Sequence, residues 1–160
     1  MTDTTNSASD FAFDVPKGFK PLNSGEDGLF IGTNGPLYHR LDGDKFVMGM
    51  RVLRRHCNPT GNCHGGMLMT FIDMTLAIGA NYQAKLGRFL PTINLAADYL
   101  APAPQGSWIE GRMDVLRTTR SLVFAQCIVT ADGVPVVRAN GIYKIGREMP
   151  STLIRGDSPG

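Results

Sequence analysis

The stretch that decides the fold runs from residue 56 to residue 83 and reads HCNPTGNCHGGMLMTFIDMTLAIGANYQ. From Gly65 to Gln83 apolar side chains recur on nearly every side, and Asp73 is the one charged residue. This pattern predicts a single helix over residues 65–83 that is apolar almost all round. Such a helix must be buried on most of its sides, and a curved sheet wrapped around it would bury it.

Segments with strand character lie on both sides of this helix. Before it, the Asp42-Gly43 turn signal separates two of them and predicts a hairpin. After Pro91, apolar and polar residues alternate with period two, which is typical of strands. The expected strands cover residues 37–41, 45–53, 92–100, 107–116, 121–130 and 135–145. This order predicts an α+β protein, in which an antiparallel sheet of five or six strands wraps around one long central helix.

Length and composition favour one soluble domain. The chain has 160 residues, of which 42% are hydrophobic and 19% charged. A net charge of +2 argues against nucleic acid as the main partner but suits an anionic small molecule. Three cysteines in a chain of this length do not indicate a disulfide framework. Neither a signal peptide nor an apolar run of about 18 residues is present, so we expect a cytoplasmic protein that does not insert into a membrane.

Three regions are expected along the chain. Residues 1–36 form an N-terminal extension, partly disordered because its first ten residues, MTDTTNSASD, are polar. Residues 37–146 form the folded domain, and residues 147–160 form a C-terminal tail.

Asp73 lies in the middle of the apolar helix, between Ile72 and Met74. Burying an unpaired carboxylate is costly, and its neighbours at helical spacing carry no positive charge. A partner is therefore expected from elsewhere in the fold or from another subunit. The alternative is that Asp73 lies on a narrow exposed stripe with Thr70 and Asn81.

Two adjacent glycines, Gly65 and Gly66, open the helix. The first N–H groups of a helix have no intrahelical partner and carry partial positive charge. Because glycine lets a ligand approach the backbone, these N–H groups are candidates for an oxyanion hole. The alternative is a loop in which the glycines only ease a turn.

The order and spacing of several residues resemble those of hotdog-fold acyl-CoA thioesterases, namely the phenylacetate-pathway (PaaI-type) and 4-hydroxybenzoyl-CoA thioesterase group. These residues are Asn58, Gly61, His64-Gly65-Gly66 and Asp73. The sequence DYLAPA at residues 98–103 is similar to the strand that follows the helix in that family. The resemblance covers roughly residues 37–146. It implies a hotdog fold whose subunits join their sheets in pairs, with active sites at the subunit interface and no cofactor or metal.

The resemblance also implies roles for individual residues. Asp73 would be the general base or the nucleophile, and Thr92 would position water near it. The N–H of Gly65 would polarise the thioester carbonyl, with the N–H of Gly66 as a further substrate contact. On the same side, Asn58 would hold the carbonyl or the attacking water, and His64 would shape the loop. Asp73 and Thr92 of one subunit would face Asn58 and Gly65 of its neighbour.

Coenzyme A carries several phosphate charges, and arginines at strand connections are candidates to bind them. Arg117, Arg120 and Ser121 lie at one such connection, with Arg54 and Arg55 as alternatives. A metal site is not expected, because the Cys-x5-Cys spacing between residues 57 and 63 matches no common zinc pattern.

Three functions are compatible with these residues. The first is hydrolysis of an acyl-CoA or aryl-CoA thioester. The second is a non-catalytic acyl-CoA-binding hotdog protein, against which the presence of Asp73 argues. The third is a hotdog dehydratase or hydratase, whose differently spaced motifs are not found here. The shared site implied by the resemblance would make a homodimer the minimum active unit, and a homotetramer is expected.

Overall fold

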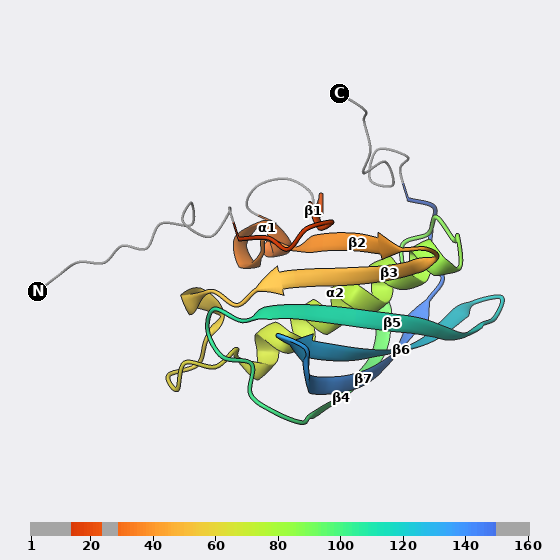
Figure 1. Cartoon of the computed structure of the whole chain (residues 1–160). Coiled ribbons are helices and arrows are strands. Elements are labelled where there is room, and N and C mark those ends of the chain that lie inside the picture. The colour runs from red at the N-terminus through yellow and green to blue at the C-terminus, as the bar shows by residue number, and fades with distance from the viewer. Residues whose placement is uncertain (1–13, 24–28, 150–160) are drawn as a thin grey trace, which may run out of the picture.

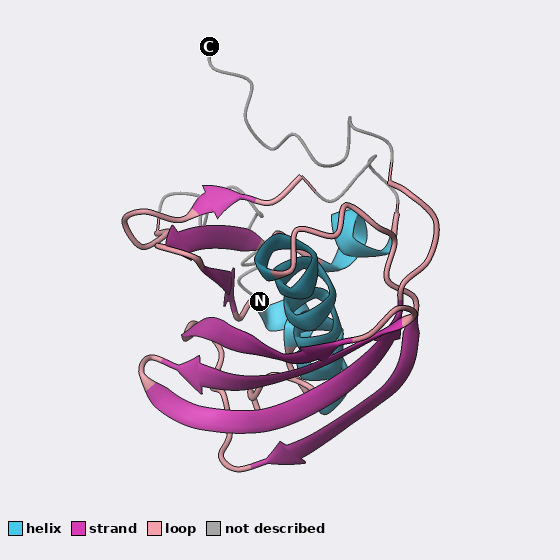
Figure 2. Cartoon of the chain, turned by 90° about the vertical axis from the view of Figure 1, so that its right-hand side faces the viewer, coloured by secondary structure: helices cyan, strands magenta, loops and turns pink. Residues whose placement is uncertain are grey.

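The computed structural model describes residues 14–23 and 29–149. One antiparallel sheet curves around the long helix α2 (Gly65–Gln83), with the strands in the order β1-β2-β3-β5-β6-β7-β4 (Figures 1 and 2). The strands are β1 (Lys20–Pro21), β2 (Tyr38–Asp42), β3 (Lys45–Arg51), β4 (Thr92–Tyr99), β5 (Trp108–Thr118), β6 (Leu122–Ala131) and β7 (Val134–Lys144). A short helix α1 (Phe30–Asn34) and a 3-10 turn η1 (Arg54–His56) complete the described elements.

The predicted architecture is confirmed, and α2 spans the predicted residues. The sheet has seven strands rather than five or six, because the two-residue β1 pairs with β2. Neither β1 nor α1 follows from periodicity, since both are short and lie in a stretch rich in glycine and proline.

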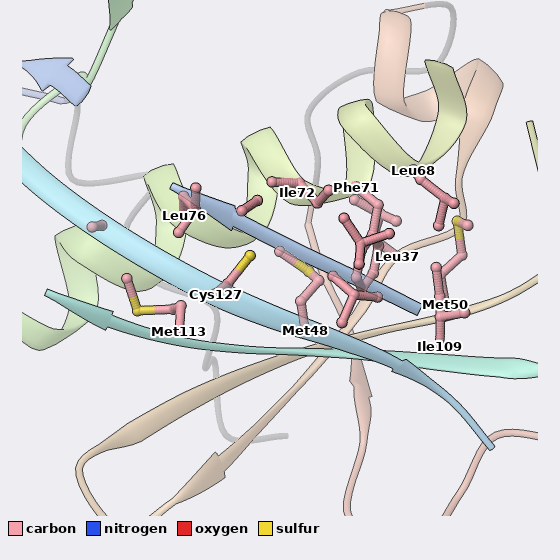
Figure 3. Close-up of a cluster of buried hydrophobic side chains, with 14 of the residues drawn as sticks. Leu37, Met48, Met50, Leu68, Phe71, Ile72, Leu76, Ile109, Met113 and Cys127 are labelled. Atoms are coloured by element: carbon pink, nitrogen blue, oxygen red, sulfur yellow. The ribbon is translucent and has the colours of Figure 1, made fainter. Parts of the chain in front are cut away.

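One face of α2 packs into the concave side of the sheet. Its residues Leu68, Phe71, Ile72 and Leu76 are at most 3% exposed. Figure 3 shows them against side chains from the strands, including Met48, Met50, Ile109 and Met113. Each such side chain contributes roughly 1.5–3 kcal/mol on burial. The opposite face of α2 remains apolar but is only partly covered in the single chain, at Met67, Met69, Met74, Ala77 and Ile78.

The N-terminal extension contributes to a second, smaller cluster on the outer face of the sheet. Phe19 contacts the Trp108 ring edge-on, with ring centroids 5.0 Å apart, and Tyr38 and Val47 complete the cluster. Gly49 lies directly beneath, since a Cβ there would be 2.3 Å from the Trp108 ring. Trp108 therefore has a packing role.

Strand β4 forms one edge of the sheet. It pairs with β7 on one side, and no strand among the described residues lies on its other side. Near this edge Ile93, Tyr99 and Leu100 are each more than half exposed. An edge that is both unpaired and apolar is a template for pairing with another chain.

The predicted disorder of residues 1–10 and most of the predicted C-terminal tail lie outside the described residues. The boundaries proposed for the three regions remain predictions. Within the described ranges, no helix is long and apolar enough to cross a membrane.

Candidate active site

The carboxylate of Asp73 is held by two hydroxyl groups from the sheet. Thr92 Oγ1, at the start of β4, donates a hydrogen bond of 2.7 Å to Asp73 Oδ1. The hydroxyl of Tyr143, near the end of β7, donates a bond of 3.0 Å to the same oxygen. These partners come from distant strands, which confirms the expectation that the carboxylate is paired from elsewhere in the fold.

The exposed-stripe alternative grouped Asp73 with Thr70 and Asn81, and all three residues are half-buried in the single chain. The Asn81 amide bonds the backbone of Arg88, donating to its carbonyl and accepting from its N–H. Thr70 donates its hydroxyl proton to the carbonyl of Gly66. Both side chains are satisfied within the helix and its following loop, whereas Asp73 reaches across to the sheet.

Tyr143 is not singled out by the sequence pattern. The side chain is fully buried, and burial together with the neighbouring negative charge of Asp73 raises the pKa of its phenol. The phenol is therefore protonated and acts as a donor at neutral pH. The signal that could have found it is the alternation along β7, which places Tyr143 on the inward face, where a tyrosine hydroxyl needs a partner.

At the N-terminus of α2, one backbone N–H is free. His64 is the N-cap residue, and its Nδ1 accepts the N–H of Gly66 at 2.9 Å. The carbonyl of His64 accepts the N–H groups of Met67 and Leu68. The N–H of Gly65 has no acceptor among the described residues. Of the two predicted donors, Gly65 is therefore available, whereas Gly66 is already bonded within the cap.

Tyr99 holds the residue that carries this free N–H, through the peptide group that follows it. The Tyr99 hydroxyl donates to the carbonyl of Gly65 at 2.9 Å. Its ring lies against the same residue, since a Cβ at position 65 would be 3.4 Å from the ring. Thus β4 supports both parts of the predicted site, Asp73 through Thr92 and Gly65 through Tyr99.

The loop before α2 is organised by Asn58. Its Oδ1 accepts the N–H and hydroxyl of Thr60, at 3.0 and 2.7 Å, and the N–H of Asn62 at 3.2 Å. These donors identify the oxygen of the amide, so that Nδ2 remains as a donor. The loop is attached to the segment after β4 by the bond from the Cys63 N–H to the carbonyl of Ala103.

His56 connects this loop to the N-terminal extension. Its ring is 3% exposed, with Nδ1 accepting from the Leu53 N–H and Nε2 donating to the carbonyl of Asn34 at the end of α1. Burial, followed by the charge of Arg55, lowers the pKa of the imidazole. The carbonyl of His56 accepts the N–H of His64 at 2.8 Å. Both ring nitrogens of His56 are thus used within the protein and are not free to bind a metal.

The two parts of the predicted site are separated within one chain. Asp73 lies eight residues after Gly65 on α2, which corresponds to about 12 Å of helix axis. The exposed residues Arg117, Arg120 and Ser121 lie at the β5–β6 turn, at the same end of the sheet as Thr92. They lie two to three strand positions from β4, about 10–14 Å at the usual strand spacing.

Comparison with known proteins identifies the class. The model of the thioesterase superfamily matches residues 60–137. A Pseudomonas aeruginosa protein, provisionally named an esterase, is 27% identical over 132 residues, covering 82% of this chain and 97% of that protein. Mouse acyl-coenzyme A thioesterase 13 is 27% identical over 89 residues, which is 54% of this chain and 61% of the relative.

Solved structures share the fold. Zebrafish thioesterase superfamily member 2 has a TM-score of 0.66 and 23% identity, covering 78% of this chain and 91% of that one. The phenylacetic acid degradation protein PaaI of Thermus thermophilus gives 0.63 and 22%, covering 72% and 97%. A Streptococcus pneumoniae thioesterase-like protein, solved with coenzyme A, gives 0.61 and 20%, covering 71% and 91%.

The fold and the match therefore define a hotdog-fold protein of the α+β class. Residues 60–137 match the thioesterase superfamily, and PaaI is among the structural neighbours of the chain. This match supports thioester hydrolysis as the general activity.

Proposed function

We propose that this protein hydrolyses an acyl-CoA or aryl-CoA thioester to the free acid and coenzyme A, with Asp73 as its catalytic carboxylate. The observation that carries the proposal is the carboxylate of Asp73, held by two neutral hydroxyls on an otherwise apolar helix. No basic side chain is bonded to it in the described structure, so its charge remains available for chemistry.

The separation of about 12 Å between Gly65 and Asp73 argues for a site shared by two subunits. The carbonyl carbon and the water that attacks it lie within about 3–3.5 Å of each other in a reactive complex, and the carbonyl oxygen is bonded to that carbon. One chain cannot place both its Gly65 N–H and its Asp73 carboxylate at such a complex. A second chain must supply one of them.

The unpaired edge of β4 provides a way to do so. Under a two-fold axis an isologous interface pairs the strand with its own copy in antiparallel fashion. The Thr92 end of one β4 then lies beside the Tyr99 end of the other. Because Thr92 holds Asp73 and Tyr99 holds Gly65, this pairing brings base and oxyanion donor together. The partly covered apolar face of α2 would be buried in the same dimer. A tetramer of two dimers remains our expectation.

In the proposed reaction, Asp73 accepts a proton from water as the water attacks the thioester carbonyl carbon. The alternative is direct attack by the carboxylate, which gives an anhydride that water then opens. In either case negative charge develops on the carbonyl oxygen, and the partner's Gly65 N–H and Asn58 Nδ2 are the donors for it. The thiolate of coenzyme A leaves. His64 contributes by capping the helix that carries Gly65.

Arg117, Arg120 and Ser121 are proposed as contacts for the phosphates of coenzyme A. They are exposed and lie at the Thr92 end of the sheet. The Streptococcus pneumoniae structural neighbour contains coenzyme A, which supports a coenzyme A thioester as the substrate class. We propose that the protein acts in the cytoplasm.

The test is thiol release from short, medium, long and aromatic coenzyme A thioesters, with wild type and Asp73→Asn compared. Asp73→Asn keeps the shape of the side chain but removes the base, and we expect turnover to fall by about 10²–10⁴-fold. A variant near wild-type rates would exclude Asp73 as the catalytic group. A folded oligomer that binds the thioesters but releases no thiol would instead support the second candidate, an acyl-CoA-binding protein.

A further inference from the structure

The two oxygens of the Asp73 carboxylate have different surroundings. Both hydroxyl donors, Thr92 and Tyr143, bond Oδ1, and no described residue donates to Oδ2. We propose that Tyr143 is a positioning residue that, together with Thr92, anchors Oδ1 and leaves Oδ2 as the oxygen that takes the proton or attacks the thioester. The assignment of Oδ2 rests on the function proposed above, whereas the anchoring of Oδ1 does not.

Tyr143 is the more rigid of the two donors. Its ring is fully buried on β7, a strand with neighbours on both sides, β6 and β4. Thr92 is exposed on the edge strand, next to an irregularity in the β4–β7 pairing. A side chain held by packing on a central strand keeps its hydroxyl in place, whereas an edge strand depends on its contacts.

Gly141 makes the position of Tyr143 possible. A Cβ at residue 141 would lie 2.7 Å from Cε2 of the Tyr143 ring and 3.1 Å from its hydroxyl oxygen. It would also lie 3.1 Å from Leu76 Cδ1, which leaves the ring little space for adjustment. The absence of a side chain at residue 141 thus allows the phenol to reach the helix at Asp73.

Neutral donors suit a carboxylate that must act as a base. Hydrogen bonds to the charged form favour that form, yet they do not cancel its charge as an arginine or lysine would. The other titratable group acting on the Tyr143 hydroxyl is Cys127, on β6. Along the chain of α2, the nearest titratable side chains are His64 and Tyr82, each nine residues from Asp73, or about 13.5 Å along the helix direction.

The first experiment measures steady-state kinetics of Tyr143→Phe across pH. Loss of a hydrogen bond to a charged group costs about 1.5–3 kcal/mol, or roughly tenfold to a hundredfold. We expect kcat to fall by about that factor with KM changed less than about threefold, because the anchor acts on the base and not on substrate binding. The acidic limb of the kcat/KM profile should move to higher pH, because the charged form of the carboxylate loses a hydrogen-bond donor.

Two further variants make the kinetic result specific. Tyr38→Phe removes the same atom from a buried tyrosine in the outer-face cluster and should leave rates and profile unchanged. Gly141→Ala keeps the hydroxyl but displaces the ring, and it should reproduce the fall in kcat and the shift of the acidic limb. A purely structural role for Tyr143 would not move the pH profile.

A second experiment does not need activity. Urea unfolding of wild type, Tyr143→Phe, Asp73→Ala and the double variant forms a double-mutant cycle, in which Asp73→Ala removes the acceptor that an asparagine would keep. If the hydroxyl is bonded to the carboxylate, the double variant should deviate from additivity by about tenfold in the unfolding equilibrium constant.

The outcomes separate this inference from the proposed function. The inference would be overturned if folded Tyr143→Phe kept the wild-type kcat and pH profile. It would also be overturned if the two substitutions changed the free energy of unfolding additively. Coupled energies in a protein that releases no thiol would support the anchoring of Oδ1 while the thioesterase proposal fails. Coupled energies together with lower kcat and a shifted profile would support both the anchoring and Oδ2 as the reacting oxygen.

Discussion

A shared site can be tested by combining two inactive chains. One chain carries Asp73→Asn, which removes the base. The other carries Asn58→Asp, which keeps the oxygen that accepts from Thr60 and Asn62 but removes the Nδ2 donor. We expect each homodimer to lose about 10²-fold or more in kcat, because a missing base and a missing oxyanion donor each have effects of that size.

The expected recovery follows from two-fold symmetry. If Asp73 of one chain works with Asn58 of the other, a heterodimer contains one site with both changes and one with neither. A heterodimer purified through two different tags should therefore have about half the wild-type activity per dimer. Random reassociation makes about half of all dimers heterodimers, so an unfractionated mixture should recover about a quarter.

The converse heterodimer predicts the opposite result. A wild-type chain paired with a chain carrying both changes has one damaged component in each shared site, and it should be inactive. If each site were built within one chain, this heterodimer would keep half its activity and the first would have none. The assay is thiol release by doubly tagged protein, with dimer integrity checked by sedimentation. An active wild-type/double-variant heterodimer would refute the argument from the 12 Å separation.

Two further predictions concern stability. Gly49→Ala should lower the free energy of unfolding by about 2 kcal/mol, because the added Cβ would overlap the Trp108 ring. Urea denaturation measures the change, and an unchanged midpoint would contradict the packing of Gly49 against Trp108. Burial lowers the pKa of His56 in the folded chain. Below about pH 6.5 the imidazole is therefore protonated more readily in the unfolded chain than in the folded chain. Stability should therefore fall as pH decreases from about 6.5 toward 5, with a smaller pH slope in His56→Gln, and equal slopes in the two proteins would contradict this.

The central helix and the main strands could be predicted because their signals are local. The apolar run from Gly65 to Gln83 and the period-two alternation after Pro91 each report a buried surface directly in the sequence. The segment before residue 37 was not predictable in the same way. Its short elements are held by contacts with residues distant in sequence, such as Phe19 on Trp108 and the carbonyl of Asn34 on His56.

The same distinction applies to the site. Asn58, His64, Gly65 and Asp73 lie within sixteen residues, so their spacing could be recognised as a unit. Tyr143 bonds Asp73 across 70 residues, and no local pattern signals that contact. The occupation of the Gly66 N–H by His64 Nδ1 depends on the rotamer of the cap residue, which sequence does not specify.

The composition of α2 links the chemistry of this protein to its assembly. A helix that is apolar almost all round needs cover on every side, yet the sheet of one chain covers one face and leaves Met69, Met74 and Ile78 partly exposed. The same helix carries the proposed oxyanion donor Gly65 and the proposed base Asp73 about 12 Å apart. In the proposed dimer, a second copy against the free edge of β4 would cover the helix and bring the two groups together. Substitutions that weaken this interface should therefore lower stability and activity together, whereas Asp73→Asn should lower activity alone.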